Sequence, residues 1–422
     1  MKFLPKGLAR TRLACNTTYL TAASVFCVPP LLFVTFHELY SISYTLLGTL
    51  IAVNFFTQLL VDLACTVLSK KYHVERLLRC IPILTTVGMT IYALVPMLFP
   101  SAAYLGLVVG TVIFSLSAGL SEVLLSPTVA AIPSERPQSD MSLLHSLYGF
   151  GVCAAVLISS AALHFVGTER WYIVMLAFSA LPLITAFLFM TSPIPDIKVG
   201  SETKAVGKRS KERAKGLALC ILCIFFGSCA ENTMTNWISS YAESALRIPK
   251  VVGDVCGVAL FALLLALARV GFAAIGKSIR PVLLVGMIAC SVCYLTAGLM
   301  PGTLIPFIAS ILIGLFSAML WPGTLILMEE NVSDPGVAGF AMLAAAGDLG
   351  ASLAPQLTGI VVDTVSAAPF AERLAASLSV STDAIGLRAG MLVTAVFPLL
   401  GTVAVILALR FFKKPKNMTS SL

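Results

Sequence analysis

Long apolar runs are the feature that most restricts how this chain can fold. A helix of about 20 mainly apolar residues spans the hydrocarbon core of a bilayer, and runs of that length recur along all 422 residues. Only 11% of the residues are charged, whereas soluble domains carry about 25%. The sequence therefore predicts an all-α integral membrane protein that is surrounded by a lipid bilayer.

The first apolar run follows Lys2, Lys6, Arg10 and Arg12 and superficially resembles a signal peptide. Its apolar part is too long for one, and no clear cleavage site follows it. We therefore interpret it as the first of twelve membrane helices. Their expected ranges are 13–36, 43–69, 80–99, 102–132, 141–165, 171–190, 216–245, 251–275, 282–300, 304–328, 337–365 and 385–412.

A polar segment divides these helices into two sets of six. Residues 192–215 contain seven basic and three acidic side chains. We expect a six-helix bundle at 1–191, a cytoplasmic linker at 192–215 and a second six-helix bundle at 216–422. The halves also correspond, because Asp62 and Lys70 are each followed 207 residues later by Arg269 and Lys277. A duplicated unit of this kind is typical of secondary transporters.

The distribution of basic residues predicts the orientation. Lysine and arginine gather near both termini, in the central linker and in the loops after the second and eighth helices, whereas the alternate loops are poor in them. Because short basic loops stay in the cytoplasm, we expect both termini on the cytoplasmic side of the plasma membrane. These loops also account for the net charge of +8, so no nucleic-acid partner is expected.

Polar motifs interrupt the apolar helices in a pattern that matches a known family. They are Asn54-Phe55-x-x-Gln58-x-x-x-Asp62, Glu122-x-x-x-Ser126-Pro127, Leu144-His145-Ser146-x-Tyr148-x-x-Gly151, Glu231-x-x-x-x-x-Trp237-x-x-x-Tyr241, Trp321-Pro322-Gly323 and Ala346-Gly347-Asp348-Leu349-Gly350. With the six-plus-six layout, they resemble the major facilitator superfamily, and within it the fucose-permease-like sugar/proton symporters. The resemblance covers essentially the whole chain. It implies that the first, fourth, seventh and tenth helices line a central cavity, with the fifth and eleventh beside it.

The seventh expected helix carries the strongest candidate site for a solute. Its residues Glu231, Asn232, Asn236 and Trp237 lie within an apolar run. A charge inside a bilayer costs at least about 2.5–3.5 kcal/mol, so such groups usually face a bundle interior or a water-filled cavity. Glu231 and Trp237 are about 120° apart on an ideal helix. One cavity therefore contacts both only if it wraps the helix or the helix breaks near 227–230, and Trp237 is equally interpretable as an interfacial anchor.

Two further side chains are candidates for solute binding. His145 can donate to a solute or act as a gating switch, and a structural hydrogen bond is the alternative. Trp321 is expected to line the cavity if the Trp-Pro-Gly kink faces inward. Asn54 and Gln58 are four residues apart and share a helix face; they either line the cavity edge or join helices, and we favour the second role, since amide pairs commonly hold helices together.

Three carboxyl groups are candidates for proton coupling: Glu122, Glu231 and Asp348. The resemblance supports Glu122, which matches the fourth-helix acid of proton-coupled sugar permeases. A structural hydrogen bond or a buried ion pair is the alternative role for these groups. Asp62 and Arg269 are expected to serve the cytoplasmic gate, where such residues cap helices or pair across the two bundles.

The leading hypothesis is a monomeric proton-coupled symporter of a small polar solute, such as a sugar. A proton-driven exporter of drugs or metabolites is the first alternative, and a receptor that binds without transporting is the second. An enzyme is not expected, because the sequence contains no nucleophile–base pair. No cofactor or metal is expected either, since the Cys-x-x-Cys pairs at 220–223 and 290–293 lie inside predicted membrane helices without a nearby histidine.

Overall fold

The computed structural model describes residues 6–68, 73–134, 137–195, 211–275, 278–332 and 336–413, and these ranges contain helices and no strands. The first bundle consists of α1 (Lys6–Leu31), α2 (Phe33–Tyr40), α3 (Tyr44–Leu68), α4 (Val74–Leu98), α5 (Ala103–Ala131), α6 (Pro137–Val166) and α7 (Trp171–Met190). The second consists of α8 (Lys211–Ser240), α9 (Lys250–Val252), α10 (Leu260–Ile275), α11 (Ile279–Leu299), α12 (Leu304–Ser317), α13 (Leu320–Asn331), α14 (Gly336–Ser366), α15 (Pro369–Leu378), α16 (Thr382–Thr394) and α17 (Val396–Phe412).

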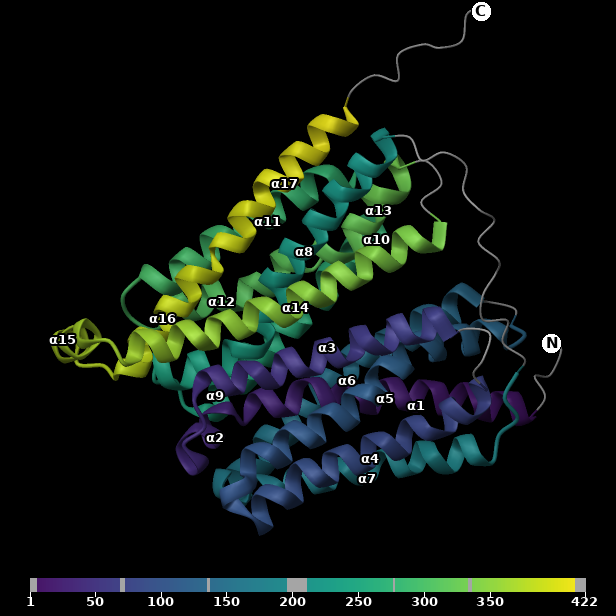
Figure 1. Ribbon diagram of the computed structural model, residues 1–422, viewed down its shortest axis with the longest axis horizontal. Coiled ribbons are helices and arrows are strands. Elements are labelled where there is room, and N and C mark those ends of the chain that lie inside the picture. Colours follow the sequence, from purple (N-terminus) through teal and green to yellow (C-terminus); the bar gives the residue numbers. More distant parts are fainter. Residues whose placement is uncertain are drawn as a thin grey trace, which may run out of the picture.

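The two bundles lie side by side with their long helices roughly parallel, and they meet most closely at one end (Figure 1). We call this the closed end; α2, α9, α15 and α16 lie there. The opposite end, where α1 and α8 begin and α17 finishes, is called the basic end. The described chain thus has the expected architecture of two helical bundles.

The number of candidate membrane helices is close to the twelve predicted from the sequence. Within the described ranges, ten helices are long and apolar enough to cross a membrane, and the α1–α2 pair, bent by 48°, makes eleven. The remaining long helix, α14, has 31 residues, which at 1.5 Å per residue is ample for a crossing. The α1–α2 bend follows Pro29 and Pro30 at the end of α1, as expected from the helix-breaking effect of proline.

The contact between α3 and α14 closes one side of the interface between the bundles. Asp363 on α14 accepts hydrogen bonds from the backbone N–H groups of Tyr44 (2.9 Å) and Thr45 (2.6 Å), and so caps the first turn of α3. A carboxylate at a helix N-terminus is favoured by the helix dipole. Gly359 permits the close crossing, because a Cβ there would lie 2.3 Å from the Tyr44 carbonyl oxygen.

A buried polar cluster holds the closed end on the other side. Lys250 donates to the carbonyl of Leu31 in the first bundle, while its Nζ lies 3.4 Å from Glu243 and 3.6 Å from Asp254 in its own bundle. Ser160 on α6 donates to the Asp254 carboxylate across the interface at 3.2 Å. Glu243 and Asp254 lie on two π-helical turns, η3 (Tyr241–Ala245) and η4 (Gly253–Ala259).

Candidate functional site: the central cavity

A cavity of about 440 Å³ lies between the two bundles. It receives side chains from α1, α3, α5 and α6 of the first bundle and from α8, α10, α13 and α14 of the second. This includes every helix that the family resemblance assigned to the cavity, with α3 and α10 in addition. The lining residues are Tyr19, Ala22, Asn54, Phe55, Gln58, Ala118, Ser121, Glu122, Ser126, Tyr148, Glu231, Asn232, Thr235, Asn236, Arg269, Trp321 and Asp348.

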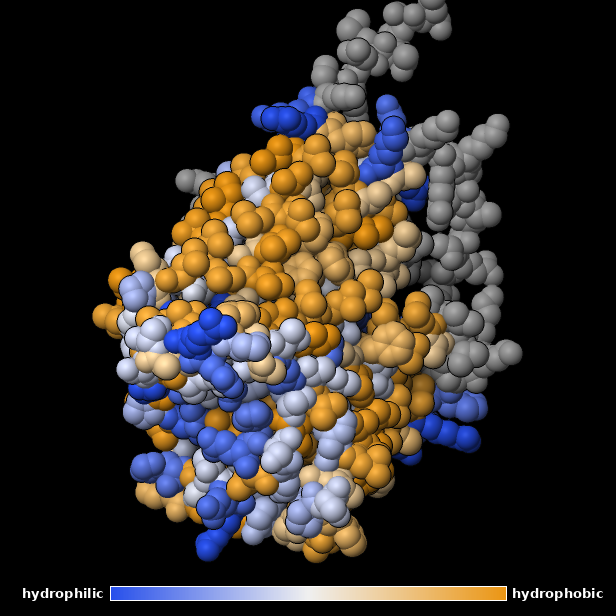
Figure 2. Space-filling model, turned by 60° about the vertical axis from the view of Figure 1, so that its left-hand side comes forward, coloured by the Kyte–Doolittle hydropathy of each residue, from blue (hydrophilic) through white to orange (hydrophobic). Residues whose placement is uncertain are grey.

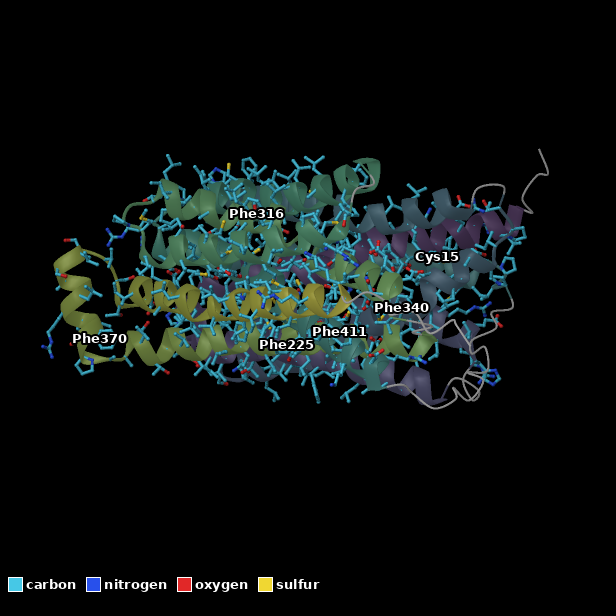
Figure 3. All side chains as sticks on the ribbon, turned by 90° about the horizontal axis from the view of Figure 1, so that it is seen from above. Cys15, Phe225, Phe316, Phe340, Phe370 and Phe411 are labelled. Carbon is cyan, nitrogen blue, oxygen red and sulfur yellow. The ribbon has the colours of Figure 1, made fainter. Side chains whose placement is uncertain are left out.

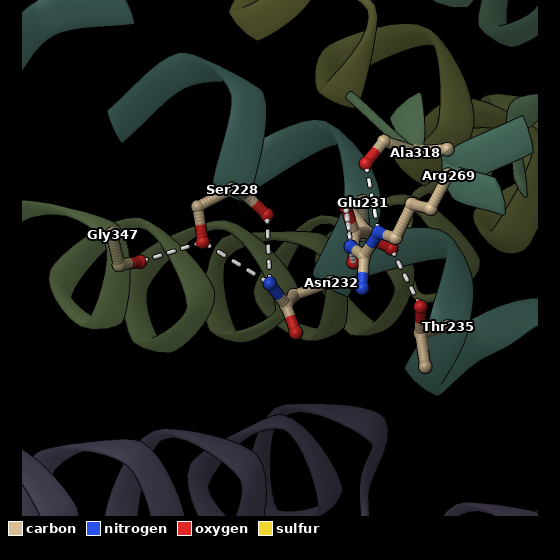
Figure 4. A network of polar contacts seen from close by, with 7 residues as sticks. All are labelled: Ser228, Glu231, Asn232, Thr235, Arg269, Ala318 and Gly347. Carbon is tan, nitrogen blue, oxygen red and sulfur yellow. Dashed lines mark hydrogen bonds and ion pairs between the residues drawn. The ribbon is translucent and has the colours of Figure 1, made fainter. Parts of the chain in front are cut away.

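An ion pair between Glu231 on α8 and Arg269 on α10 occupies the second-bundle wall (Figure 4). The Arg269 Nη2 atom lies 3.2 and 3.5 Å from the two Glu231 carboxylate oxygens. The Nε atom of the same guanidinium donates to the carbonyl of Ala318 at 2.9 Å. Ala318 lies between α12 and α13, where the chain leaves the regular helix. One arginine therefore joins α8, α10 and the α12–α13 break, as its forked set of donors allows.

A second polar chain connects α8 with α14 in the same wall (Figure 4). The Ser228 hydroxyl donates to the Gly347 carbonyl at 2.6 Å. The Asn232 amide donates to the Ser228 hydroxyl at 3.1 Å, and the Asn236 amide donates to the Asn232 carbonyl at 2.8 Å. These bonds hold the side chains of two asparagines that line the cavity in one orientation. In each amide the nitrogen can be told from the oxygen because it donates to a named acceptor.

The Trp321 ring packs directly against the backbone of α14. A Cβ at Gly347 would lie 2.2 Å from two atoms of this ring, so only glycine accommodates the indole here. Trp321 thereby lies beside Asp348, the next residue along α14, and both line the cavity. This arrangement gives an aromatic surface next to a carboxyl group, which suits a solute with both polar and apolar faces.

Two carboxyl groups face the cavity from opposite bundles. Glu122 on α5 is exposed to the cavity, and Asp348 on α14 is buried, with 8% of its surface accessible. Within the described ranges neither has a hydrogen-bond or ion-pair partner within contact distance, in contrast to Glu231. Because Glu122 and Asp348 line the same cavity, their negative charges repel each other when both groups are ionised. The cavity therefore contains one neutralised acid and two acids without a neighbouring cation among the described residues.

Trp237 lies outside the cavity, contrary to the grouping expected from sequence. It is fully buried at the closed end, donates from Nε1 to the Pro355 carbonyl at 3.1 Å and contacts Phe33 edge-on at 5.5 Å between ring centroids. The helix break proposed near 227–230 is absent, since α8 is continuous from Lys211 to Ser240. A straight helix places Trp237 on a different face from Glu231, and there it packs against the first bundle.

The two residues expected at the gate are separated. Arg269 lines the cavity and pairs with Glu231, whereas Asp62 lies on α3 outside the cavity lining. Asp62 and Arg269 thus occupy corresponding positions in the two halves of the sequence, but they do not belong to one site in the structure. His145 falls within α6, but its side chain lies outside the described residues.

Some lining residues have a second role or were not assigned to the cavity from the sequence. Asn54 joins two helices, since its Oδ1 accepts from Ser115 on α5 at 2.6 Å as well as from Gln58 in its own helix at 3.1 Å, and it also lines the cavity. Tyr19 and Tyr148 line the cavity as well. The feature of the sequence that could have pointed to these two residues is a tyrosine hydroxyl within an apolar helix. That signal is weak, because buried tyrosines are common wherever their hydroxyl finds a partner.

No three His, Cys, Asp or Glu side chains in the described part of the chain are placed to bind a metal ion. The side chains that line the cavity can form hydrogen bonds, ion pairs and ring contacts, and its carboxyl groups can take up protons.

Comparison with known proteins identifies one matching family and several solved structures with a similar fold. The family model of the Major Facilitator Superfamily matches residues 15–355. A bacterial homolog of the human lysosomal transporter Spinster, solved in an inward-facing and occupied conformation, superimposes with a TM-score of 0.80 at 14% identity, covering 97% of this chain and 98% of that one. A search of curated proteins finds no significant match.

Two sugar/proton symporters are also structurally similar. A D-xylose–proton symporter gives a TM-score of 0.73 at 13% identity, covering 93% of this chain and 97% of that chain. The fucose:proton symporter FucP of E. coli gives 0.58 at 13% identity, with 96% and 99% covered. At these identities the similarity establishes the fold.

Proposed function

Because the chain belongs to the Major Facilitator Superfamily, we propose that it is a secondary transporter that carries a small polar solute, such as a sugar, together with a proton. The solute would cross through the central cavity by alternating access, as the two bundles rock about a site near the middle of the membrane. The observation that carries the proposal is the polar cavity between the bundles, to which both contribute carboxyl groups.

The composition of the wall supports a hydroxylated solute. Asn232, Asn236 and Thr235 line one side, and Asn54 and Gln58 line the other. Amide and hydroxyl groups both donate and accept hydrogen bonds, which matches the hydroxyl groups of a sugar. A more apolar cavity would instead support the alternative function, export of amphipathic drugs.

The unpaired acids support proton coupling. A carboxylate without a cation is costly in a low-dielectric site, and taking up a proton removes that cost. Glu122 and Asp348 meet this description among the described residues, and they belong to different bundles. A proton on either acid would also reduce their mutual repulsion, which favours a state in which the bundles approach each other around the solute.

The contacts between the bundles support an inward-facing state in the plasma membrane. The bonds of Asp363, Lys250 and Ser160 join the bundles at the closed end. If basic loops are cytoplasmic, the closed end faces outward. A similar bacterial protein was solved in an inward-facing conformation.

Uptake of a labelled sugar panel into proteoliposomes, with and without an inward proton gradient, tests this function. We expect gradient-driven uptake that Glu122→Gln and Asp348→Asn uncouple. Glu75→Gln serves as the control, since Glu75 is exposed and, among the described residues, pairs only with Arg79 one turn away. Uptake whose proton dependence survives both cavity variants would contradict the coupling proposal. Solute binding without flux would indicate a receptor instead.

A further inference from the structure

Helix α15 carries bulky apolar side chains that no part of the described chain covers. Phe370, Leu374 and Leu378 are 56%, 42% and 58% exposed. Because they are spaced four residues apart, they share one face of this ten-residue helix. Three large apolar side chains on one face of a short helix form an apolar patch whose exposure to water is unfavourable.

The rest of the apolar face of α15 is already packed against the bundle. Ala371 and Ala375 are buried and contact Ile385 and Val365. On a helical wheel, at 100° per residue, these alanines directly adjoin the three exposed side chains. Glu372 and Arg373 occupy the remaining side, and both are exposed. The helix thus has small residues toward the protein, charges on one flank and bulky apolar residues on the other.

The helix is held rigidly in this orientation. The Arg247 guanidinium donates to the Ser379 carbonyl at 2.6 Å, and the backbone N–H of Val380 donates to the Ala375 carbonyl at 3.0 Å. Ser379 adopts a left-handed conformation with φ of 54° and ends the helix. The Val380 bond closes the C-terminal turn of α15 itself, whereas the Arg247 contact and the buried Ala371 and Ala375 attach the helix to the second bundle and set the direction of its apolar face.

The position of α15 identifies what those surroundings are. It lies across the direction of the long helices, with Phe370 at the end of the molecule far from Cys15 (Figure 3). When the closed end is turned toward the viewer, it is largely hydrophilic, and a hydrophobic flank borders it (Figure 2). On α14, the exposed residues Leu353, Leu357 and Ile360 share one face, because they are spaced four and three positions apart, and they lead along the helix toward α15.

We infer that α15 is an interfacial anchor whose partner is the lipid surface at the closed end. Phe370, Leu374 and Leu378 insert among the outermost acyl chain segments, while the charged flank lies among headgroups and water, the arrangement typical of amphipathic interfacial helices. With one acid and one base on that flank, the insertion is driven by apolar contact and does not require anionic lipid. The inference depends on the chain being a membrane protein and is independent of what it transports.

Tryptophan substitution tests this inference in the full-length protein. Leu374→Trp and the matched control Glu372→Trp are reconstituted into phosphatidylcholine vesicles, and the wild-type emission is subtracted from each. We expect Leu374→Trp to give blue-shifted emission that is quenched by acyl chains brominated near the headgroup and protected from aqueous iodide. Glu372→Trp should show the reverse, and adding anionic lipid should change neither.

Two outcomes would overturn the inference. If iodide quenches Leu374→Trp as strongly as Glu372→Trp, the face is in water. If neither quencher reaches Leu374→Trp, the face is covered by protein, and cross-linking would then identify a second copy of the chain. Phe370→Trp exchanges one aromatic ring for another on the same face. It repeats the test if Leu374→Trp does not fold.

Discussion

Arg269 organises the cavity wall at the scale of a single residue. Its guanidinium neutralises Glu231 and also satisfies the Ala318 carbonyl. A lysine at this position would supply the positive charge but not the planar, forked arrangement of donors, because its ammonium is a compact point charge. The role of Arg269 is therefore set by geometry as well as by charge.

The variant Arg269→Lys is expected to lose stability, but less than Arg269→Ala, which also leaves the Glu231 carboxylate without its cation. Hydrogen bonds to charged groups contribute about 1.5–3 kcal/mol each, and a lysine retains at most one of the two contacts. Thermal unfolding in detergent, measured for both variants, checks this expectation. A lysine variant as stable as wild type would show that charge alone matters at position 269.

Gly347 provides a second test, because it admits the Trp321 ring. We expect Gly347→Ala to displace this indole into the cavity, to lower solute uptake and to destabilise the protein by about 1–3 kcal/mol through overpacking. Gly149→Ala is the matched control, since nothing lies within 4 Å of a Cβ placed there. Equal effects of the two substitutions on uptake would rule out a role for the Trp321 position.

Residue roles were only partly predictable from the sequence. Glu122, Asp348 and Trp321 could be assigned to the cavity because a polar or large aromatic side chain within a membrane helix rarely faces lipid. Trp237 could not be placed, since an indole also suits a buried site with one hydrogen-bond acceptor. The partner of Arg269 was equally inaccessible, because a long side chain reaches neighbours that the sequence position does not specify.

At the scale of helices, the interruptions position the polar groups. The break between α12 and α13 exposes the Ala318 carbonyl, and the π-helical turns η3 and η4 carry Glu243 and Asp254. Such turns are common at functional sites. The long helices follow from hydrophobic length alone, whereas these interruptions depend on contacts between helices. The sequence therefore predicted the long helices and a kink at Trp321-Pro322-Gly323, close to the α12–α13 break, but not the two π-helical turns.

Removing the charge of Lys250 is expected to loosen the closed end. In Lys250→Met the Glu243 and Asp254 carboxylates lose their cation, and breaking a buried pair by deleting one partner costs about 3–5 kcal/mol. Hydrogen exchange should rise in η4 and in α2. Adding Glu243→Gln to Lys250→Met should recover part of the protection, because it removes one uncompensated charge. Unchanged exchange in the single variant would contradict the proposed clasp.

At the scale of the whole molecule, the fold was predictable because membrane helices, a central linker and duplicated halves leave few alternative arrangements. The site was less predictable, because it forms where the halves face each other. Which residues meet there depends on the tilt and rotation of each bundle. Glu122 and Asp348 are 226 positions apart in sequence, yet both line one cavity.

If the bundles must separate at the closed end during each cycle, a covalent link across them should stop transport. Ser352 on α14 donates to the backbone carbonyl of Ala52 on α3 at 3.3 Å, so these positions are in contact across the interface, and Ala52→Cys with Ser352→Cys introduces one thiol in each bundle. We expect oxidation to abolish uptake while solute binding from the basic end persists, and reductant to restore flux. Each single cysteine variant controls for the native thiols. Uptake that continues in the fully oxidised pair would exclude this motion.

The acceptor of Lys250 in the first bundle is a backbone carbonyl, that of Leu31. Leu31 ends α1, and a helix end leaves its last carbonyl groups without intrahelical partners. Every amino acid supplies the same backbone carbonyl, so the side chain at position 31 takes no part in this contact. Position 31 is therefore constrained by packing, since Leu31 is 1% exposed and belongs to the hydrophobic core, and not by the contact with Lys250. The contact itself constrains the side chain only at position 250, while in the first bundle it depends on where α1 ends.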